Sequence, residues 1–360
     1  MSRTLPLSVI VSTCESGATL EEALAAIRAS DLPRDSYELI VVDDASRDRS
    51  VAIAARYADT VVKLPLRRCG PAYARNRGVE LSRGEVVAFV DGDVVIPADT
   101  LTGMLAILEA RPEVDAVAAS RHERPGARNF VSQYWNLLLR FGEERYSSKS
   151  AQFPTGCGAV RREVFIAAGM YDEWRFASAS LECLELGERL LARGHRVVLS
   201  ASLQAAQLRR WSALGICSEI WTRSTLIARS LGYSRMNAVA PSDVVFTLSR
   251  TLVPGVALLG AMFLAAAFVP SSAPATRALM ALACLVFANF PLFRFYARAR
   301  GVGFAMLSAP VHVLIQIVAA TALVKGWILR DVLGDVAPDA TTQAYAEVGL
   351  EVWPPIPRRR

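Results

Sequence analysis

Two acidic motifs contain the residues best suited to do chemistry. Asp91 and Asp93 flank a single glycine directly after the apolar run VVAFV. If that run is a β-strand, alternation along the strand points both carboxylates the same way. Two hard oxygen ligands on one side suit a divalent cation that a diphosphate also holds. A plain turn is the alternative, because Asp and Gly are common in turns. We favour the metal site.

A second acidic pair, Asp43 and Asp44, ends another apolar run, ELIVVDD. Both runs belong to a regular alternation of strand-like and helix-like segments in the first part of the chain. This alternation predicts a mostly parallel, doubly wound α/β sheet, in which ligands bind beyond the carboxyl ends of the strands. Both acidic pairs would therefore lie at the ligand-binding edge of the sheet.

The expected elements continue through the middle of the chain. We expect strands at residues 7–13, 38–44, 60–64, 85–91, 114–119 and 196–200. We expect helices at 17–30, 49–57, 72–81, after Pro97, and at 130–141, 182–193 and 211–231, with a glycine-rich turn at 155–158. The helix at 211–231 is basic and amphipathic, which fits a helix in a membrane interface or an ordinary packed surface helix.

The composition favours a membrane partner over nucleic acid. The chain has 360 residues, of which 52% are hydrophobic, and a formal net charge of +6. A basic protein can work beside anionic lipid head groups, and we find no zinc-finger spacing or interleaved basic and aromatic residues. The six cysteines are scattered without a CxxC motif, which indicates free thiols in a reducing compartment. The apolar run near the N-terminus is only a strand long, so we expect no signal peptide.

Three long apolar stretches predict a membrane region near the C-terminus. They cover residues 251–270, 278–293 and 304–324, and the third contains Pro310, so it could span the membrane or re-enter it. The loop FRFYARARG between the second and third stretches is rich in arginine, whereas the loop after the first has none. The positive-inside rule therefore places the arginine loop and the N-terminal domain in the cytoplasm.

Several motifs together resemble a known family. SVIVSTCES, ELIVVDDASRDRS, GPAYARNRGVE, GEVVAFVDGDV, TGCGAVRREVF and LECLELGERLLARGHRVVL occur in the order and spacing of family 2 glycosyltransferases. The resemblance covers roughly residues 6–211 and is specific as a set. It implies the Rossmann-like GT-A fold and a nucleotide-diphosphate sugar as donor.

The resemblance also implies roles for the donor-side residues. Asp44 would bind the nucleobase, with Asp43 supporting the same loop, and Arg75 and Asn76 would line the nucleotide side. Arg75 could instead snorkel from a surface helix.

Asp91 and Asp93 match the DxD motif that binds ribose and the metal–diphosphate, with Mg²⁺ or Mn²⁺ as the cation. The metal would neutralise the leaving nucleotide in the transition state.

Three positions depart from the family pattern. Such enzymes place a Glu-Asp pair at the start of the helix near 182, and its aspartate acts as general base, whereas this chain has Glu182-Cys183. A protonated thiol is a poor base, so Glu182 would have to substitute. Cys14 replaces an aromatic residue that stacks on the base, and Gln207 replaces a histidine that can contact the metal.

These features predict an inverting, metal-dependent glycosyltransferase at the inner, cytoplasmic membrane. Its catalytic domain would be cytoplasmic, and its acceptor a lipid or a polyprenyl phosphate. The alternative is a catalytically impaired relative that binds a nucleotide sugar or a partner at the membrane. We expect a GT-A domain at 1–210, an amphipathic linker at 211–245, a membrane region of two or three transmembrane or re-entrant helices at 246–330, and a cytoplasmic or loosely ordered tail at 331–360.

Overall fold

The computed structural model describes residues 5–65, 69–146, 156–173, 181–230, 287 and 289–334. Its strands are β1 (Leu5–Thr13), β2 (Tyr37–Asp43), β3 (Thr60–Lys63), β4 (Gly84–Asp91), β5 (Val94–Val95), β6 (Ala116–Arg121), β7 (Cys157–Arg161) and β8 (Val197–Gln207). Its α-helices are α1 (Leu20–Arg28), α2 (Ser50–Tyr57), α3 (Gly70–Leu81), α4 (Thr100–Ala110), α5 (Phe130–Tyr146), α6 (Arg162–Ala167), α7 (Glu182–Ala192), α8 (Ala213–Ser230), α11 (Phe290–Arg300) and α12 (Val302–Trp327).

The strands form one sheet of eight in the order β3-β2-β1-β4-β7-β6-β8-β5. The first four strands along the chain pair in parallel, which confirms the predicted α/β arrangement. The second half is mixed, because β7 runs antiparallel to both β4 and β6. The glycine-rich segment predicted as a turn thus leads into β7, whose small residues pair with the buried strand β4.

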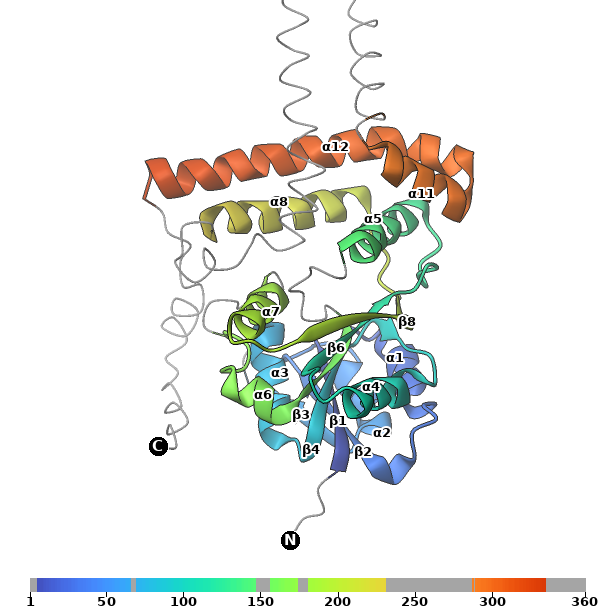
Figure 1. Cartoon of the computed structure of the whole chain (residues 1–360), viewed down its shortest axis with the longest axis vertical. Helices are drawn as coiled ribbons and strands as arrows, with labels where there is room; N and C mark the ends of the chain where they lie inside the picture. The colour runs from blue at the N-terminus through green and yellow to red at the C-terminus, as the bar shows by residue number, and fades with distance from the viewer. Residues whose placement is uncertain are drawn as a thin grey trace, which may run out of the picture.

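The parallel half buries side chains on both faces of the sheet, which explains its continuous apolar runs. In β1, Val9 and Val11 pack with Leu24 of α1, whereas Ile10 packs on the opposite face with Val79 of α3. Figure 1 shows the helices on the two sides of the sheet. This packing holds the carboxyl ends of β1 and β4 at a common edge, since the two strands are paired in register up to Ser12 and Asp91.

A second layer of helices lies beyond the carboxyl ends of the strands (Figure 1). It consists of α5, α8, α11 and α12, and its core contains Trp135, Trp211, Ile220, Tyr296 and Ala319. Because α5 follows β6 and α8 follows β8, the sheet domain leads directly into this helical layer.

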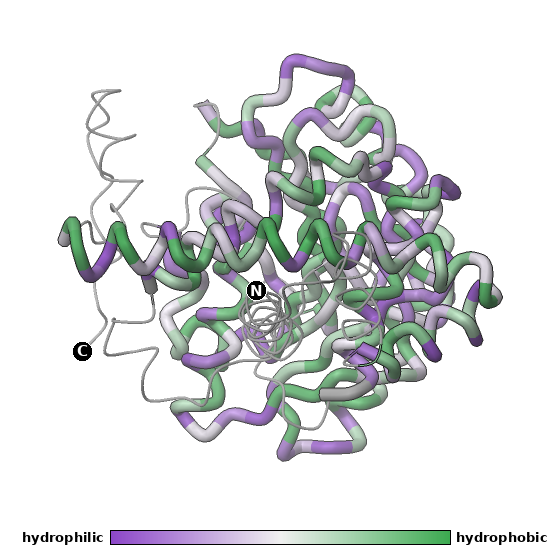
Figure 2. The backbone as a smooth tube through the Cα atoms, turned by 90° about the horizontal axis from the view of Figure 1, so that it is seen from above, coloured by the Kyte–Doolittle hydropathy of each residue, from purple (hydrophilic) through white to green (hydrophobic). Residues whose placement is uncertain are grey.

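The helical layer differs from the predicted membrane region in two ways. The arginine stretch predicted as a loop forms α11, because Phe293 and Tyr296 are buried against its neighbours. The 304–324 stretch forms α12, which runs unbroken through Pro310 and has mostly hydrophobic residues (Figure 2). The predicted span at 251–270 and most of the one at 278–293 lie outside the described residues.

Within the described part of the chain, one helix is long and apolar enough to cross a membrane, at Val302–Val332. One face of this helix is buried and contains Ala309, Ile315 and Ala319. Met306 and Val324, on the opposite face, are exposed. Length and composition alone are weak evidence for a membrane span, because a packed helix of a soluble protein can meet the same criteria.

We predict that Gly84→Ala destabilises the sheet domain. A Cβ at this position would lie 2.4 Å from the backbone nitrogen of Ser8, so the β1–β4 pair would have to shift. Overpacking of this kind lowers the free energy of unfolding by about 1–3 kcal/mol, measurable by chemical denaturation in detergent. Gly303→Ala is the control, because a Cβ there would meet open space. Equal stability of the two variants would contradict the prediction.

Candidate functional site

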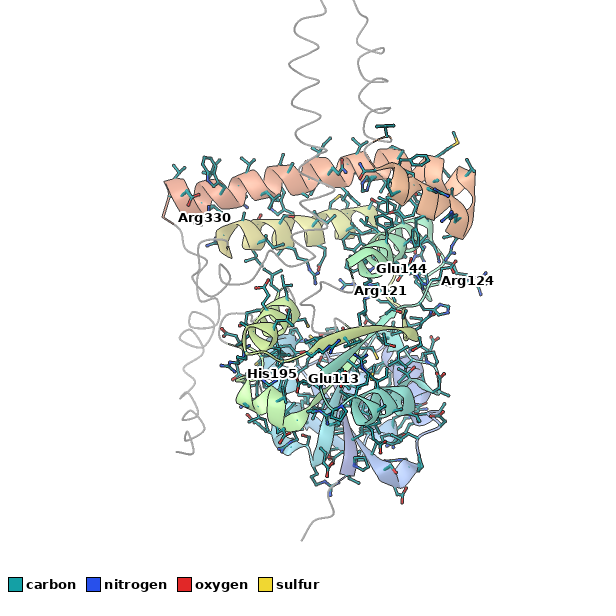
Figure 3. All side chains as sticks on the ribbon, in the orientation of Figure 1. Glu113, Arg121, Arg124, Glu144, His195 and Arg330 are labelled. Atoms are coloured by element: carbon teal, nitrogen blue, oxygen red, sulfur yellow. The ribbon has the colours of Figure 1, made fainter. Side chains whose placement is uncertain are left out.

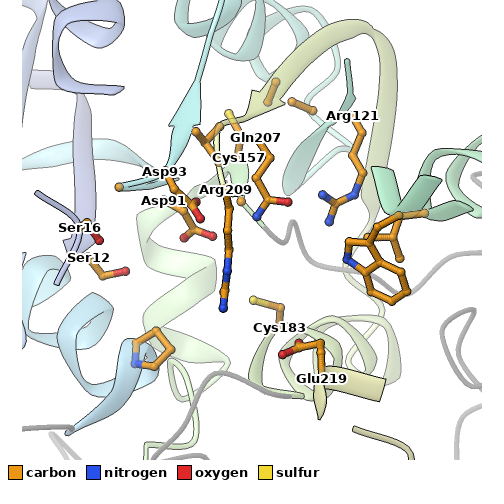
Figure 4. Close-up of a pocket in the computed structure, with 18 of the residues that line it drawn as sticks. Ser12, Ser16, Asp91, Asp93, Arg121, Cys157, Cys183, Gln207, Arg209 and Glu219 are labelled. Atoms are coloured by element: carbon orange, nitrogen blue, oxygen red, sulfur yellow. The ribbon is translucent and has the colours of Figure 1, made fainter. Parts of the chain in front are cut away.

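A pocket of about 250 Å³ lies at the carboxyl ends of β1 and β4 (Figure 4). The sheet domain contributes Ser12, Asp91 and Asp93 to its lining, and the helical layer contributes Trp135 of α5 together with Glu219 and Arg223 of α8. The lining also includes Arg75, Arg121, Cys157, Glu182, Cys183, Gln207, Arg209 and Trp211. The pocket therefore lies between the two layers of the molecule.

The two carboxylates of the DxD sequence face this pocket (Figure 4). The Asp91 backbone N–H donates to the Gly156 carbonyl at 2.9 Å, which fixes the end of β4 against the start of β7. Burial and the neighbouring charge of Asp91 raise the pKa of Asp93 to about 6, against the opposing effects of Arg209 and other groups. A partly protonated carboxylate beside a second one is a site where a cation would relieve the repulsion.

Among the described residues, no cluster of three or more His, Cys, Asp or Glu side chains could hold a metal ion alone. Asp91 and Asp93 could supply two oxygen ligands, and the remaining ligands would have to come from a bound diphosphate. The Gln207 amide donates a hydrogen bond to Asp93, which lowers the pKa of that carboxyl.

Arg75 is a buried cation that links both walls of the pocket. Its Nη2 donates to Asp91 Oδ1 at 2.8 Å, and its Nη1 lies 3.3 Å from Glu182 Oε1. Its guanidinium also lies over the Tyr171 ring, 5.4 Å from the centroid. The alternative of an arginine that snorkels from a surface helix is wrong, because only 7% of the Arg75 side chain is exposed.

The pair at the start of α7 does not supply an obvious base. Burial, with the nearby Glu182 carboxylate, raises the pKa of the Cys183 thiol to about 12, so the thiol is protonated at neutral pH. Glu182 is itself buried, and its carboxylate is paired with Arg75. The start of α7 therefore offers a protonated thiol and a carboxylate that is already in an ion pair.

Asp44 and Asp43, which are predicted to bind the nucleotide sugar, accept hydrogen bonds from nearby backbone N–H groups. Asp44 accepts hydrogen bonds from the Cys69 and Gly70 N–H groups at 2.9 and 3.0 Å, at the start of α3. Asp43 accepts one from the Ser46 N–H at 2.9 Å. Both lie at the carboxyl end of β2, so contact with a nucleobase stays a prediction.

The Asn76 side chain faces away from the pocket toward a neighbouring loop. Its amide nitrogen donates to the Tyr171 carbonyl at 2.9 Å, and its amide oxygen accepts from the Tyr171 N–H at 3.1 Å. A further hydrogen bond of 2.7 Å joins the amide nitrogen to Glu173. The amide therefore anchors this loop, and the pocket lining does not include it.

Sequence reasoning missed four charged residues of the pocket, which come from β6, from the chain after β8, and from α8. Arg209 lies over the Trp211 ring at 4.2 Å from its centroid and points into the pocket (Figure 4). Arg121 pairs with Glu143 of α5 at 3.0 Å, and Figure 3 shows it between the sheet and the helices. Glu219 and Arg223 come from α8. The only signal for them was the mixture of charged and tryptophan residues in that helix.

Comparisons with known proteins agree with this geometry. Residues 8–168 match the family described as glycosyl transferase family 2. The poly(ribitol-phosphate) β-N-acetylglucosaminyltransferase TarS of Staphylococcus aureus is 33% identical over 109 residues, 29% of this chain and 19% of TarS. An undecaprenyl-phosphate 4-deoxy-4-formamido-L-arabinose transferase of Pseudomonas aeruginosa is 32% identical over 142 residues, 37% of this chain and 41% of that protein. The matches thus span less than half the length of these curated relatives.

A solved structure shares the fold over most of the chain. The mannosyltransferase PcManGT of Pyrobaculum calidifontis, in complex with GDP-Man and Mn²⁺, aligns with a TM-score of 0.61 and 22% identity. The alignment covers 90% of this chain and 88% of that one. At this identity the likeness establishes the fold, which is the predicted GT-A fold.

We predict that Arg75→Met destabilises the protein strongly. The change leaves the Asp91 and Glu182 carboxylates without their shared cation, and removing one partner of a buried pair costs about 3–5 kcal/mol of unfolding free energy. Arg56→Met is the matched control, because the Arg56–Glu21 pair is exposed and worth about 0–1 kcal/mol. Chemical denaturation checks both. An Arg75 variant as stable as the Arg56 variant would refute the role of this cation.

Proposed function

We propose that the chain, whose residues 8–168 match the family described as glycosyl transferase family 2, transfers a sugar from a nucleotide-diphosphate sugar to an acceptor at a membrane, with inversion at the anomeric carbon. The observation that carries the proposal is the pair Asp91 and Asp93, which face a pocket at the carboxyl ends of the strands. In open α/β sheets this edge is where ligands bind.

The donor diphosphate would be held through a divalent cation, Mg²⁺ or Mn²⁺, bound by Asp91 and Asp93. The site fits a cation because its two carboxylates are adjacent and one has a pKa raised to about 6 by burial and by its neighbour. When bound, the cation neutralises negative charge on the leaving nucleotide. Arg75 would fix Asp91 through their 2.8 Å ion pair, so that the carboxylate is already oriented when the donor arrives.

The acceptor would be a lipid or a polyprenyl phosphate that reaches the pocket from the helical layer. The α12 face opposite its packed face exposes Met306, Leu314, Ile317 and Val324, which suits contact with lipid. A relative whose name includes undecaprenyl-phosphate as substrate supports an acceptor of this class.

The catalytic domain would lie on the cytoplasmic side of the inner membrane. Arg300, in the arginine-rich helix α11, pairs with Glu123 of the sheet domain at 2.8 Å. The arginine-rich segment and the catalytic domain therefore lie on the same side of any membrane, and the positive-inside rule makes that side cytoplasmic. The proposal of a multi-pass protein rests on residues 251–270 and 278–286, outside the described ones.

A second candidate function is nucleotide-sugar binding without turnover. The observation that favours it is the state of the α7 pair, because Cys183 is protonated at neutral pH and Glu182 is bound by Arg75. Such a protein would keep donor affinity and lack transfer, so binding and turnover must be measured separately.

We predict that Mn²⁺-dependent nucleotide binding weakens on acidification. A proton competes with the cation for Asp93, whose pKa is about 6, so affinity should fall about tenfold between pH 7 and pH 5. Calorimetric titration of UDP and GDP with Mn²⁺ at both pH values checks this. Asp93→Asn should bind weakly at both values with no such pH dependence. A wild-type affinity that is the same at pH 5 and pH 7 would contradict a cation on Asp93.

We predict metal-dependent turnover of at least one donor. The purified chain in detergent, given membrane lipid extract and Mn²⁺, is assayed with a panel of UDP- and GDP-sugars for release of the nucleoside diphosphate. Asp93→Asn should lower kcat/KM by about 100-fold or more, because charge stabilisation of the leaving group is lost. Asp35→Asn, at an exposed position outside the pocket lining, is the matched control and should leave the rate unchanged. Tight nucleotide binding without turnover for every donor would favour the second candidate.

A further inference from the structure

We propose that Glu219 of α8 is the general base that the start of α7 does not supply, and hence that the acceptor reacts through a hydroxyl group. This inference rests on the proposed transferase activity and deepens it. It assigns a catalytic role to the helical layer, which would otherwise serve only to attach the enzyme to a membrane.

Glu219 lines the same pocket as Asp91 and Asp93, although its helix α8 follows the last strand of the sheet. Figure 4 shows its carboxylate pointing into the pocket toward Cys183, the position where the family places its base, with the two aspartates across the pocket. A carboxylate from α8 thus lies in the same pocket as the two aspartates.

Glu219 is more accessible than the other acids near this position. The Glu182 side chain, paired with Arg75, is 7% exposed, and the Glu185 side chain, paired with Arg189 at 2.6 Å on α7, is 13% exposed. The Glu219 side chain, which is paired with Arg223, is 27% exposed. Of the described acids that line the pocket, Asp91 and Glu182 pair with Arg75, and Asp93 is assigned to the cation, which leaves Glu219.

An ion pair with Arg223 restricts the Glu219 side chain. Arg223 lies one helical turn later, and its Nε is 2.7 Å from Glu219 Oε1. A base must lie within hydrogen-bond reach of the proton that it removes, and a fixed carboxylate reduces the entropy cost of reaching that geometry.

Helix α12 packs against α8. Ile216 and Ile220 of α8 are buried, and α12 approaches α8 closely at Gly326, where a Cβ would lie 2.6 Å from the Ala228 Cβ. Arg330 also donates to the Ala228 carbonyl at 3.0 Å. The apolar helix α12 therefore supports α8, the helix that carries Glu219.

The chemical step follows from this placement. The acceptor hydroxyl oxygen forms a bond to the anomeric carbon while the bond from that carbon to the diphosphate oxygen breaks. The hydroxyl proton passes to the Glu219 carboxylate, and the bonding electron pair leaves with the nucleoside diphosphate. A phosphate acceptor is already an anion and requires no base, so dependence on Glu219 distinguishes the two acceptor chemistries.

The test compares Glu219→Gln with Glu144→Gln in the full-length chain. Glu144 is a matched control, because its Oε1 also pairs with an arginine Nε at 2.7 Å four residues away, on α5 (Figure 3). Release of nucleoside diphosphate is measured with Mn²⁺, with water and then membrane lipid extract as acceptor. We expect Glu219→Gln to lower kcat by about 100-fold or more while the Mn²⁺–nucleotide Kd stays within twofold of the wild-type value. Glu144→Gln should keep the wild-type rate.

Retention of the Mn²⁺–nucleotide Kd shows that the Glu219→Gln chain is folded, so a fall in kcat alone reports the loss of the base. Turnover of Glu219→Gln within threefold of Glu144→Gln would overturn the assignment, and so would a loss of kcat matched by an equal loss of nucleotide affinity. If the wild-type chain itself turns over no donor, the transferase proposal fails, which is distinguishable from failure of the base assignment alone.

Discussion

The buried guanidinium of Arg75 determines how the sheet domain can present carboxylates to its pocket. Asp91 ends β4 and Glu182 begins α7, and the two acids approach the same cation at 2.8 and 3.3 Å. Without that cation, the two carboxylates would repel each other. Arg75 thereby orients Asp91 at the pocket and holds the Glu182 carboxylate in an ion pair.

The helical layer completes a site that the sheet domain leaves open. Residues of α5 and α8 form the wall opposite the DxD sequence. The Trp135 and Trp211 rings, whose centroids are 6.1 Å apart, join that wall to the chain after β8. The layer is built like an ordinary core on one side and exposes apolar residues of α12 on the other. The wall of the pocket and the exposed apolar face thus belong to helices of one packed layer.

Much of the sheet domain could be predicted from its sequence because local pattern and burial agree there. The apolar runs that end at Asp43 and Asp91 are buried strands, and the acids follow them at the expected edge. The antiparallel strand β7 was missed, because a five-residue strand of small residues has no periodic signal. Glu219 could not be found either, because its place in the pocket depends on how α8 folds back over the sheet domain, which no local pattern encodes.

The order of the strands has a consequence for synthesis on the ribosome. The parallel unit β1 to β4 is complete by residue 91, so it can form while the rest of the chain is still being made. β8 pairs with β5 across more than a hundred residues, and α12 reaches α8 only after a further segment of comparable length. A nascent chain in which this unit has formed presents its acidic edge before the covering helices are made. Until they are in place, that edge is open to the ions and nucleotides of the surrounding solution.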